Sequence, residues 1–341
     1  MQTKALLLAA GSGKRLFPLS DGISKPMFQI FDRPIIGQII KGLKNAGISN
    51  IYVVSRPNDS FMHEYVKKLG CKIIVQEKPE GTAKAVELAK EYINGNFIIA
   101  AGDHFLDLEI YKELSSYELD NVLVAKYIEG DVKNFGLLEI KCGIVKNIIE
   151  KPENINEGFI NLLIIKTNDA IFDKIKDVKI SKRGEYEIVD VLNNFYAHIT
   201  LRRWFDIGWP WAILDLLHAF EEYVKIDEKC ELQNASIKNS YVGKNCIIKN
   251  SIIENAMICD NCVINNSYIS NSYIMQNAKI VSSNLKNSFI GMNAEIKNVN
   301  TNPVINEIAI LDKIIRPKIP IGLISGSNKI LNAGNFSCHV V

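Results

Sequence analysis

A stretch near the start of the chain, LLLAAGSGKRLFPLSDGISKPM, combines residue types that hold phosphate groups. Gly11 and Gly13 follow an apolar run that is typical of a buried strand, and Arg15 and Lys25 add two cations. Glycine amides beside two cations suit a polyphosphate whose charge must be neutralised along its length. A plain turn with basic surface side chains is the alternative interpretation, and the combination of features favours the phosphate site.

Two well-known phosphate motifs do not fit this stretch. The P-loop needs a lysine followed by Ser or Thr, whereas Lys14 is followed by Arg15. The dinucleotide-binding fingerprint needs a third glycine where Leu16 stands, and Pro18 disfavours the helix that should follow. The sequence therefore predicts a long, irregular loop.

Two aspartates are candidate metal ligands. Asp103 follows a glycine at the end of an apolar run, and Asp206 lies in the segment RRWFDIG. Mg²⁺ takes oxygen ligands from one or two carboxylates together with phosphate oxygens, which makes such a pair a candidate Mg²⁺ site. Helix capping or turn formation is the alternative role for each aspartate, and spacing alone does not pair them.

The composition limits the class of protein. The chain has 341 residues, 47% of them hydrophobic, which is enough for two domains with their own cores. A net charge of +2 gives no reason to expect nucleic acid or an anionic membrane as a partner, and no transmembrane run or signal peptide is expected. Seven scattered cysteines indicate reduced thiols and a cytoplasmic protein, with Cys259 and Cys262 as structural residues.

Apolar runs alternate with amphipathic stretches over the first 220 residues, which predicts a doubly wound, mostly parallel α/β sheet. Strands are expected over 4–10, 51–54, 72–75, 97–101 and 122–127, and helices over 35–46, 61–69 and 82–92. In such sheets ligands bind beyond the carboxyl ends of the strands, where the glycine loop and Asp103 lie.

A repeat begins after about residue 226. Aliphatic residues recur in steps of 5, 5 and 6, so that three steps add up to 16 residues. They are Leu232, Ile237, Val242, Ile248, Ile253, Ile258, Ile264, Ile269, Ile274, Ile280, Leu285, Ile290 and Ile296. Ala, Ser or Cys stands two positions before each, and Asn stands three positions before eleven of them. The pattern predicts a parallel β-helix with triangular coils, inward aliphatics and left-handed Asn residues at the corners.

These patterns predict three regions. Residues 1–225 would form the catalytic α/β domain, residues 226–300 the β-helix with 16-residue coils, and residues 301–341 a C-terminal cap or degenerate coil.

The first 211 residues also resemble the sugar-1-phosphate nucleotidylyltransferases. The motifs that carry the resemblance, in chain order, are LAAGSGKRLxPL, SKPM, EKPEGTA, AGD, IIEKP, GEYEIVD and WFDIGWPW. The β-helix is similar to the left-handed one appended in bacterial and archaeal members. The resemblance therefore implies a Rossmann-like nucleotide-diphospho-sugar transferase domain followed by a left-handed β-helix.

The resemblance also implies roles for single residues. Arg15 would bind the β- and γ-phosphates and the leaving pyrophosphate, Lys25 would neutralise the α-phosphate and the sugar phosphate, and Asp103 and Asp206 would hold Mg²⁺. The nucleotide-binding residues would be Ala10, Gly11, Gly13, Gln76, Gly81, Thr82 and Gly102, with Gln76, Gly81 and Thr82 reading uracil or thymine. The sugar phosphate would lie against Gly136, Glu150, Lys151 and Asn161.

The implied reaction joins a hexose 1-phosphate, with glucose 1-phosphate favoured, to the α-phosphorus of UTP or dTTP and releases pyrophosphate. Catalysis then consists of aligning two anions and stabilising spread negative charge, so no Ser-His or Cys-His pair is needed. Two positions depart from the family pattern: Leu163 stands where a glycine usually lets the sugar approach the backbone, and Trp209 replaces a small polar residue.

Two alternatives remain open. A second, acetyltransferase activity in the β-helix would need a general base, and His339 is the only histidine after residue 218. A non-catalytic regulatory subunit would show loss of the phosphate and metal residues, whereas Arg15, Lys25, Asp103 and Asp206 are all present. A homo-oligomer is expected, as a trimer through the β-helix or a multiple of it.

Overall fold

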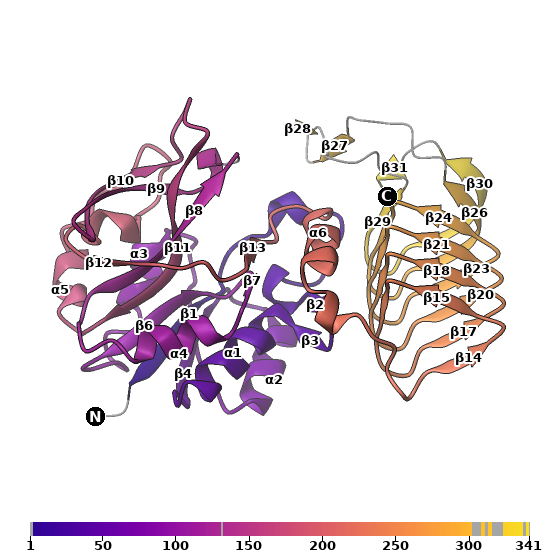
Figure 1. The fold of residues 1–341 in the computed structure, drawn as a ribbon, viewed down its shortest axis with the longest axis horizontal. Helices are drawn as coiled ribbons and strands as arrows, with labels where there is room; N and C mark the ends of the chain where they lie inside the picture. The colour runs from indigo at the N-terminus through magenta and orange to yellow at the C-terminus, as the bar shows by residue number, and fades with distance from the viewer. Residues whose placement is uncertain are drawn as a thin grey trace. The chain divides into compact units, whose positions relative to one another are not determined.

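The computed structural model describes residues 3–130, 132–301, 308–310, 313–315, 323–336 and 339–340. Its contacts divide the chain into two compact units (Figure 1). One consists of Met1–Gly11 and Ile36–Trp204, and the other of Ser12–Ile35 and Phe205–Val341. Most of the glycine loop therefore belongs to the same compact unit as the β-helix. The three regions expected from the sequence, with borders at 225 and 300, remain a prediction.

A nine-stranded sheet forms the centre of the first unit (Figure 1). In spatial order its strands are β5 (Lys72–Val75), β4 (Asn50–Ser55), β1 (Lys4–Leu8), β6 (Phe97–Ala101), β11 (Glu157–Thr167), β8 (Val122–Glu129), β12 (Tyr196–Ile199), β10 (Ile144–Glu150) and β9 (Gly136–Lys141). The first four strands are parallel, as the alternating pattern predicts. β11 then enters antiparallel between β6 and β8, and β9 and β10 form an antiparallel hairpin.

Helices pack against this sheet and against each other, and the doubly wound α/β fold is confirmed. They are α1 (Ile35–Asn45), α2 (Ser60–Lys68), α3 (Thr82–Glu87), α4 (Glu109–Ser115) and α5 (Ile171–Ile175). α3 and α5 contact each other and share a core with β1 and β6. On α1, Gly37 faces Tyr65 of α2 and Gly42 faces Tyr111 of α4, where any side chain would collide. The helix expected over 82–92 ends at Glu87, and turns with i→i+3 hydrogen bonds follow it.

Several short elements connect these parts. The 3-10 helices are η1 (Lys14–Leu16), η2 (Lys25–Met27), η3 (Val132–Asn134), η4 (Ile188–Val191) and η5 (Glu221–Tyr223). The remaining elements before the β-helix are β2 (Gln29–Ile30), β3 (Arg33–Pro34), β7 (His104–Leu106), β13 (Trp204–Asp206) and α6 (Ala212–Ala219). Within the described residues, no helix combines the length and the apolar character needed to cross a bilayer.

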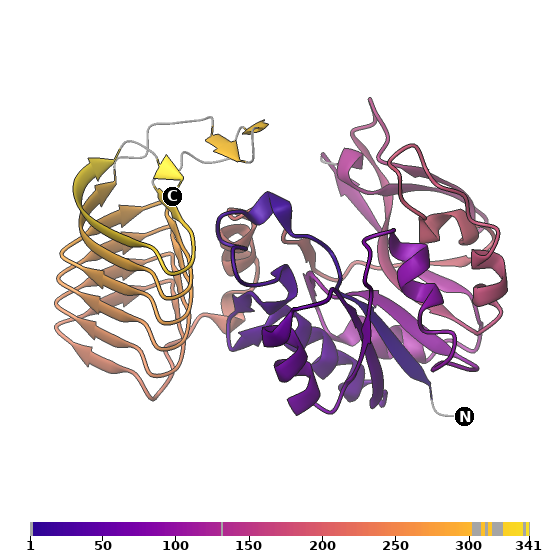
Figure 2. The same cartoon turned by 180° about the vertical axis from the view of Figure 1, so that it is seen from behind.

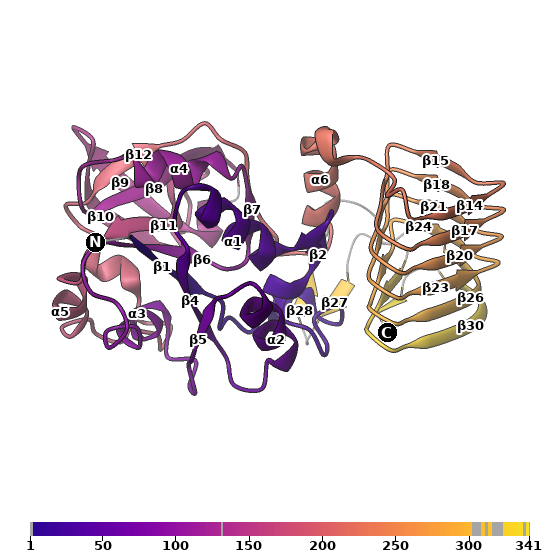
Figure 3. The same ribbon diagram turned by 90° about the horizontal axis from the view of Figure 1, so that it is seen from below.

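The second unit contains the parallel left-handed β-helix that was expected, and Figures 2 and 3 show its coils stacked in regular layers. From β14 to β26, strands of one face pair 16 residues apart, so that Ile248, Ile264, Ile280 and Ile296 form one inward column. The first face is formed by β14 (Glu231–Gln233), β17 (Ile247–Lys249), β20 (Val263–Asn265), β23 (Lys279–Val281), β26 (Glu295–Thr301) and β30 (Ile330–Phe336). The second is formed by β15 (Ser236–Lys238), β18 (Ile252–Glu254), β21 (Tyr268–Ser270) and β24 (Asn284–Lys286). The third is formed by β16 (Tyr241–Val242), β19 (Met257–Ile258), β22 (Tyr273–Ile274), β25 (Phe289–Ile290), β29 (Leu323–Ser325) and β31 (His339–Val340).

The corners follow the expected rule. Twelve of the thirteen corner residues have positive φ, between 46° and 61°, and eleven of these are asparagines. Asparagine tolerates this left-handed backbone better than most residues. The corner side chains also stack, since Asn277 Nδ2 donates to Asn293 Oδ1 at 2.9 Å one coil later. The predicted register of the β-helix is therefore confirmed.

The small residues beside the corners have a role that spacing did not predict. The Ser267 hydroxyl accepts a hydrogen bond from the backbone N–H of Ser283, and the Ser283 hydroxyl accepts one from Val299, at 3.1 Å each. Each hydroxyl also donates to a backbone carbonyl two residues earlier in its own coil. Serine at these positions therefore fits a narrow space and also forms hydrogen bonds with backbone groups of two adjacent coils.

Much of the expected cap over 301–341 lies outside the described residues. In the described part, β29 and β30 pair in parallel with β25 and β26 and so extend two faces of the β-helix. β27 (Ile308–Ile310) and β28 (Lys313–Ile315) pair antiparallel with each other.

Candidate active site

The glycine loop leaves β1 in an irregular conformation, as expected. Gly11 has open space around the position of a side chain, and Gly13 has a φ of 61° at the start of η1. The loop then forms only short 3-10 turns before η2, where Lys25 begins the segment Lys25–Met27. Such a backbone leaves amide groups without helical partners and available to an anion.

Lys25 and Asp206, which are 181 residues apart in the sequence, form an ion pair. Lys25 Nζ lies 2.8 Å from Asp206 Oδ1, and the two side chains are only 10% and 18% exposed. A Cβ atom at Gly208 would lie 3.0 Å from Asp206 Oδ2 and 3.5 Å from Arg15 Nη1, which places both charged groups beside this glycine. The structure therefore brings Arg15, Lys25 and Asp206 together within one compact unit.

Arg15 has an aromatic neighbour as well. Its guanidinium lies 5.8 Å from the centre of the Trp209 ring, and Trp209 stacks on Trp211 at 5.3 Å with an angle of 4° between the rings. A cation over an indole face is attracted by the ring quadrupole. Trp209, which departs from the family pattern, therefore contacts a candidate catalytic residue.

Asp103 lies in the other compact unit, directly after β6. The backbone N–H of Gly102 donates to the carbonyl of Leu8 at 2.9 Å, and a Cβ atom at Gly102 would lie 2.9 Å from that of Ala9. Glycine is therefore required where β1 and β6 end side by side. Asp103 Oδ1 lies 3.7 Å from His104 Nε2, and the Asp103 side chain is about one-third exposed.

The two aspartates supply carboxylate oxygens, which is the donor chemistry that Mg²⁺ prefers. Because they belong to different compact units, their pairing around one ion remains a prediction. Within the described residues, no group of three or more His, Cys, Asp or Glu side chains forms a preassembled metal site.

The candidate base-binding residues are held by a motif to which the sequence analysis assigned no role. Gln76 Nε2 donates to the Gly81 carbonyl at 3.2 Å, and the backbone N–H of Ile188 donates to Thr82 Oγ1 at 2.9 Å. Gly81 has a φ of 108°, and a Cβ atom there would lie 2.5 Å from the carbonyl oxygen of Tyr186. The GEYEIV segment therefore fixes the position of the EGTA segment. Both motifs could be recognised in the sequence, but their contact could not be predicted from it.

The candidate sugar residues cluster on β9, β10 and β11. Gly136 pairs with Glu150 across β9 and β10, and the Lys151 backbone N–H donates to the Phe135 carbonyl at 3.0 Å. Arg183 bridges Glu150 and Glu187, at 3.3 and 3.0 Å. Burial, followed by the charge of Glu187, raises the pKa of Glu150 above its usual value. Sequence reasoning missed Arg183 and Glu187.

Leu163 occupies an unusual backbone position. Its φ is 53°, it lies where the pairing of β11 with β8 is interrupted between Asn161 and Ile165, and its N–H donates to Asn161 Oδ1 at 2.9 Å. Glycine adopts this conformation far more easily than leucine. The positive φ supports the sequence alignment that places Leu163 at a position usually held by glycine.

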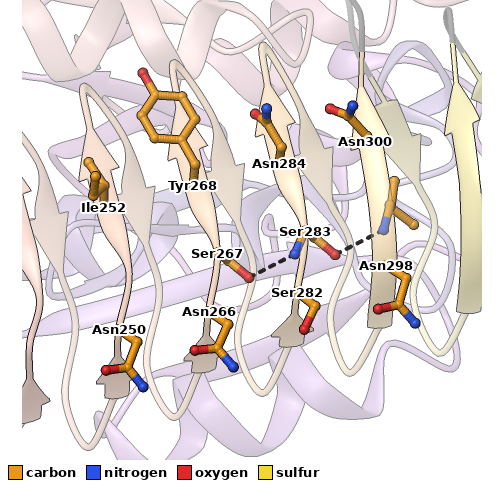
Figure 4. A pocket seen from close by; sticks show the side chains of 11 residues that line it. Asn250, Ile252, Asn266, Ser267, Tyr268, Ser282, Ser283, Asn284, Asn298 and Asn300 are labelled. Carbon is orange, nitrogen blue, oxygen red and sulfur yellow. Dashed lines mark hydrogen bonds between the residues drawn. The ribbon is translucent and has the colours of Figure 1, made fainter.

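A groove of about 480 Å³ lies elsewhere, on the outside of the β-helix (Figure 4). It is lined by Asn250, Ile252, Asn266, Ser267, Tyr268, Ser282, Ser283, Asn284, Asn298, Val299 and Asn300. None of these is a predicted site residue, and none is a histidine or a carboxylate.

Comparison with known proteins identifies the family. The model of the nucleotidyl transferase family matches residues 4–223. The bifunctional protein GlmU of Methanococcus maripaludis strain C7 is 32% identical over 250 residues, which are 70% of this chain and 59% of that protein. A glucose-1-phosphate thymidylyltransferase of Neisseria gonorrhoeae is 30% identical over 205 residues, which are 57% of this chain and 70% of that protein.

A solved structure of UDP-glucose pyrophosphorylase complexed with UDP-glucose superimposes with a TM-score of 0.59 at 19% identity, over 65% of this chain and 99% of that one. That likeness concerns the fold alone. The chain spans 54% to 59% of the length of the GlmU proteins it matches. Since the family model matches residues 4–223, a range that covers more than half of the chain and includes the glycine loop, Asp103 and Asp206, the chain belongs to the nucleotidyl transferase family.

Proposed function

We propose that this protein is a sugar-1-phosphate nucleotidylyltransferase that uses UTP or dTTP and glucose 1-phosphate. A phosphate oxygen of the sugar attacks the α-phosphorus of the nucleotide. The bond from that phosphorus to the bridging oxygen breaks, and pyrophosphate leaves with the bond's electron pair. The products are a nucleoside-diphosphate sugar and pyrophosphate.

The observation that carries the proposal is the gathering of Arg15, Lys25 and Asp206 next to the glycine loop. Lys25 neutralises the α-phosphate and the incoming sugar phosphate, which otherwise repel each other. Arg15, which is solvent-exposed, meets the β- and γ-phosphates and stabilises the charge that builds up on pyrophosphate. The amides of Gly11 and Gly13 contact the nucleotide phosphates.

Mg²⁺ held by Asp103 and Asp206 would supply charge neutralisation for the phosphate oxygens. The Asp206 carboxylate pairs with Lys25 and so is already oriented toward a cation. Asp103→Asn and Asp206→Asn should therefore lose Mg²⁺-dependent turnover. Asp107→Asn is the control, because it breaks a pair with Arg203 in the same unit as Asp103 and should keep that turnover.

The base and the sugar are proposed from the family resemblance of the residues that match the base-binding and sugar-binding positions. Gln76, Gly81 and Thr82 contact uracil or thymine, and Gly136, Glu150, Lys151 and Asn161 contact the sugar phosphate. Leu163 adds a bulky side chain to the sugar pocket, which favours glucose 1-phosphate over a sugar with a large substituent at C2.

We also propose a cytoplasmic homo-oligomer, with a trimer formed through the β-helix. The six described cysteines are free thiols, as in a reducing compartment, and Ile252 is 46% exposed on the second face of the β-helix. Light scattering should give a mass three times that of the 38.3 kDa chain, or a multiple of that. A monomer mass at micromolar concentration would contradict the trimer.

The function is tested by measuring pyrophosphate release over a panel of nucleoside triphosphates and sugar 1-phosphates, with and without Mg²⁺. We expect turnover with UTP or dTTP together with glucose 1-phosphate, and formation of the matching nucleotide sugar by mass spectrometry. Absence of turnover with every pair would contradict the proposal and favour a non-catalytic role.

A further inference from the structure

One face of the β-helix differs from the other two. Its outward residues include Tyr241, Met257, Tyr273 and Phe289, and each is at most 1% exposed. On the neighbouring face, the outward residue Ile252 is 46% exposed. Large outward side chains are buried only where another segment packs on them, so a segment of the same compact unit covers this face.

The covering segment includes the hairpin of β2 and β3, in which Gln29 pairs with Pro34 and Ile30 with Arg33. Phe31 lies at its turn, fully buried, with a φ of 56°. The Phe31 ring stacks on Tyr223 at 5.0 Å and meets Tyr241 edge-on at 5.5 Å. A phenylalanine in this strained conformation persists only where its surroundings fix it.

Gln29 is the most tightly held residue of the hairpin. Its Nε2 donates to Asp260 Oδ1 at 2.8 Å, and its Oε1 accepts from the backbone N–H of Asp260 at 3.3 Å. Its carbonyl oxygen accepts from the Tyr273 hydroxyl at 2.9 Å and from the Cys259 thiol at 3.6 Å. Gly243 has no side chain at the point where one would collide with the Asp260 carboxylate.

A short, ordered link joins Gln29 to the candidate catalytic lysine. Only Pro26, Met27 and Phe28 separate the two, and the Phe28 N–H donates to the Lys25 carbonyl at 3.0 Å. Lys25 and Gln29 are 8% and 2% exposed. A displacement of Gln29 is therefore transmitted to Lys25 instead of being absorbed by a flexible loop.

We propose that the β-helix positions Lys25 for catalysis through the hairpin, with Gln29, Asp260 and Tyr273 as positioning residues. This inference rests on the proposed function, because it assigns to the β-helix the task of fixing the lysine that neutralises the α-phosphate. Misplacing a catalytic group by about 1 Å lowers turnover about 100-fold when binding is otherwise intact. The expected signature is therefore a loss in kcat with little change in KM.

The first test exchanges donor and acceptor. Gln29→Glu sets a carboxylate against Asp260, and we expect kcat to fall about 30-fold to 100-fold with KM within about 3-fold. Asp260→Asn in the same chain restores a donor for the new carboxylate, and the double variant should recover at least about tenfold in kcat. A merely structural contact would change the melting temperature without this rescue of kcat.

The second test compares two matched tyrosines of one coil. Tyr273→Phe removes the hydroxyl that binds Gln29, and Tyr268→Phe removes a hydroxyl that donates to Glu254 at 2.9 Å on another face. We expect kcat to fall about 3-fold to 10-fold in the first variant and to stay unchanged in the second. Equal kcat in both variants and the wild type would overturn the inference.

Hydrogen–deuterium exchange provides a readout that does not depend on activity. In Gln29→Glu, amides of residues 24–34 should exchange faster, while those of β20 to β25 keep wild-type protection. If the wild type shows no nucleotidyl transfer, the proposed function has failed and exchange still tests the positioning. The inference would be overturned, and the proposed function kept, if the wild type shows turnover and Gln29→Glu changes neither kcat nor the exchange rates.

Discussion

Most of the glycine loop belongs to the same compact unit as the β-helix, yet the structures of the two regions are determined in different ways. In the β-helix, each corner is specified by neighbouring residues, such as Asn277 with Ala278 and Ile280 after it. In the loop, Lys25 is oriented by Asp206, 181 residues away, and in the hairpin that follows, Gln29 is oriented by Asp260, 231 residues away. A regular scaffold can be encoded locally, whereas a phosphate-binding loop takes its shape from distant partners.

The largest effect should come from a charge placed inside the β-helix. Ile264 is fully buried in the inward column, so Ile264→Asp introduces a carboxylate without a partner and should prevent folding or make the protein insoluble. Val263 precedes it on the same strand and points outward, half-buried, so Val263→Asp should remain soluble. Solubility and thermal melting decide the comparison, and a soluble Ile264→Asp with native melting would show that the register is wrong.

A smaller effect is expected at Leu163, which lies in β11 where the pairing with β8 is interrupted. Leu163→Gly removes the bulk from the sugar pocket and suits the φ of 53°. The wild type should prefer glucose 1-phosphate over N-acetylglucosamine 1-phosphate by a factor corresponding to about 1–3 kcal/mol, and the variant should narrow that gap. The measurement is kcat/KM for both sugars with UTP and dTTP. A wild-type preference for the acetylated sugar would refute the role of Leu163.

The contribution of a corner asparagine to the stability of the β-helix can be measured at a single corner. Asn277 has a φ of 61°, and its side chain donates to Asn293. Asn277→Ala should lower the free energy of unfolding by about 1–2 kcal/mol because alanine disfavours this backbone, and Asn277→Gly should cost less. Urea titration compares the two variants. Equal losses would mean that the side-chain ladder, and not the backbone, determines the cost.

The smallest effect should be the pH dependence of the Glu150–Glu187 cluster. Burial raises the pKa of both carboxyls above 4.5, so the folded state holds their protons more tightly than the unfolded state. The stability from this source is complete below about pH 4.5 and is lost as the pH rises through the raised values.

Glu187→Gln should therefore reduce the fall in melting temperature as the pH rises above about 4.5. Glu139→Gln is the control, since Glu139 lies on β9 with an exposed side chain. An identical pH profile in wild type and Glu187→Gln would contradict this assignment.

The sequence was informative where structure repeats or where a strand is buried. The twelve positive-φ corners and the parallel strands β1, β4, β5 and β6 followed from spacing and apolar runs. The β9–β10 hairpin was missed because in β10 only Val145 is fully buried, which leaves almost no alternating pattern to detect. The antiparallel strand β11 was missed for a different reason, because its long buried run carries no signal of strand direction.

The candidate site was predictable as a set of residues but not as an arrangement. Sequence motifs identify Arg15, Lys25 and Asp206 as candidates. Their proximity depends on the tertiary fold, which brings the segment around Gly208 next to Arg15. The backbone of Tyr186 packs against Gly81, and Arg183 forms an ion pair with Glu150. Both contacts join segments that are not related by a periodic pattern in the sequence. Such contacts arise from tertiary packing, which residue types alone do not encode.

The most direct test of the central claim is the turnover of Arg15→Ala beside that of the wild type, with the melting temperature of both. Arg15 is exposed and its guanidinium lies over the Trp209 ring, so its loss should shift melting by less than about 2 °C. The account predicts that pyrophosphate release with glucose 1-phosphate and UTP or dTTP falls about 100-fold to 1,000-fold, because a cation that stabilises the leaving group is gone. Turnover equal to that of the wild type would contradict the account.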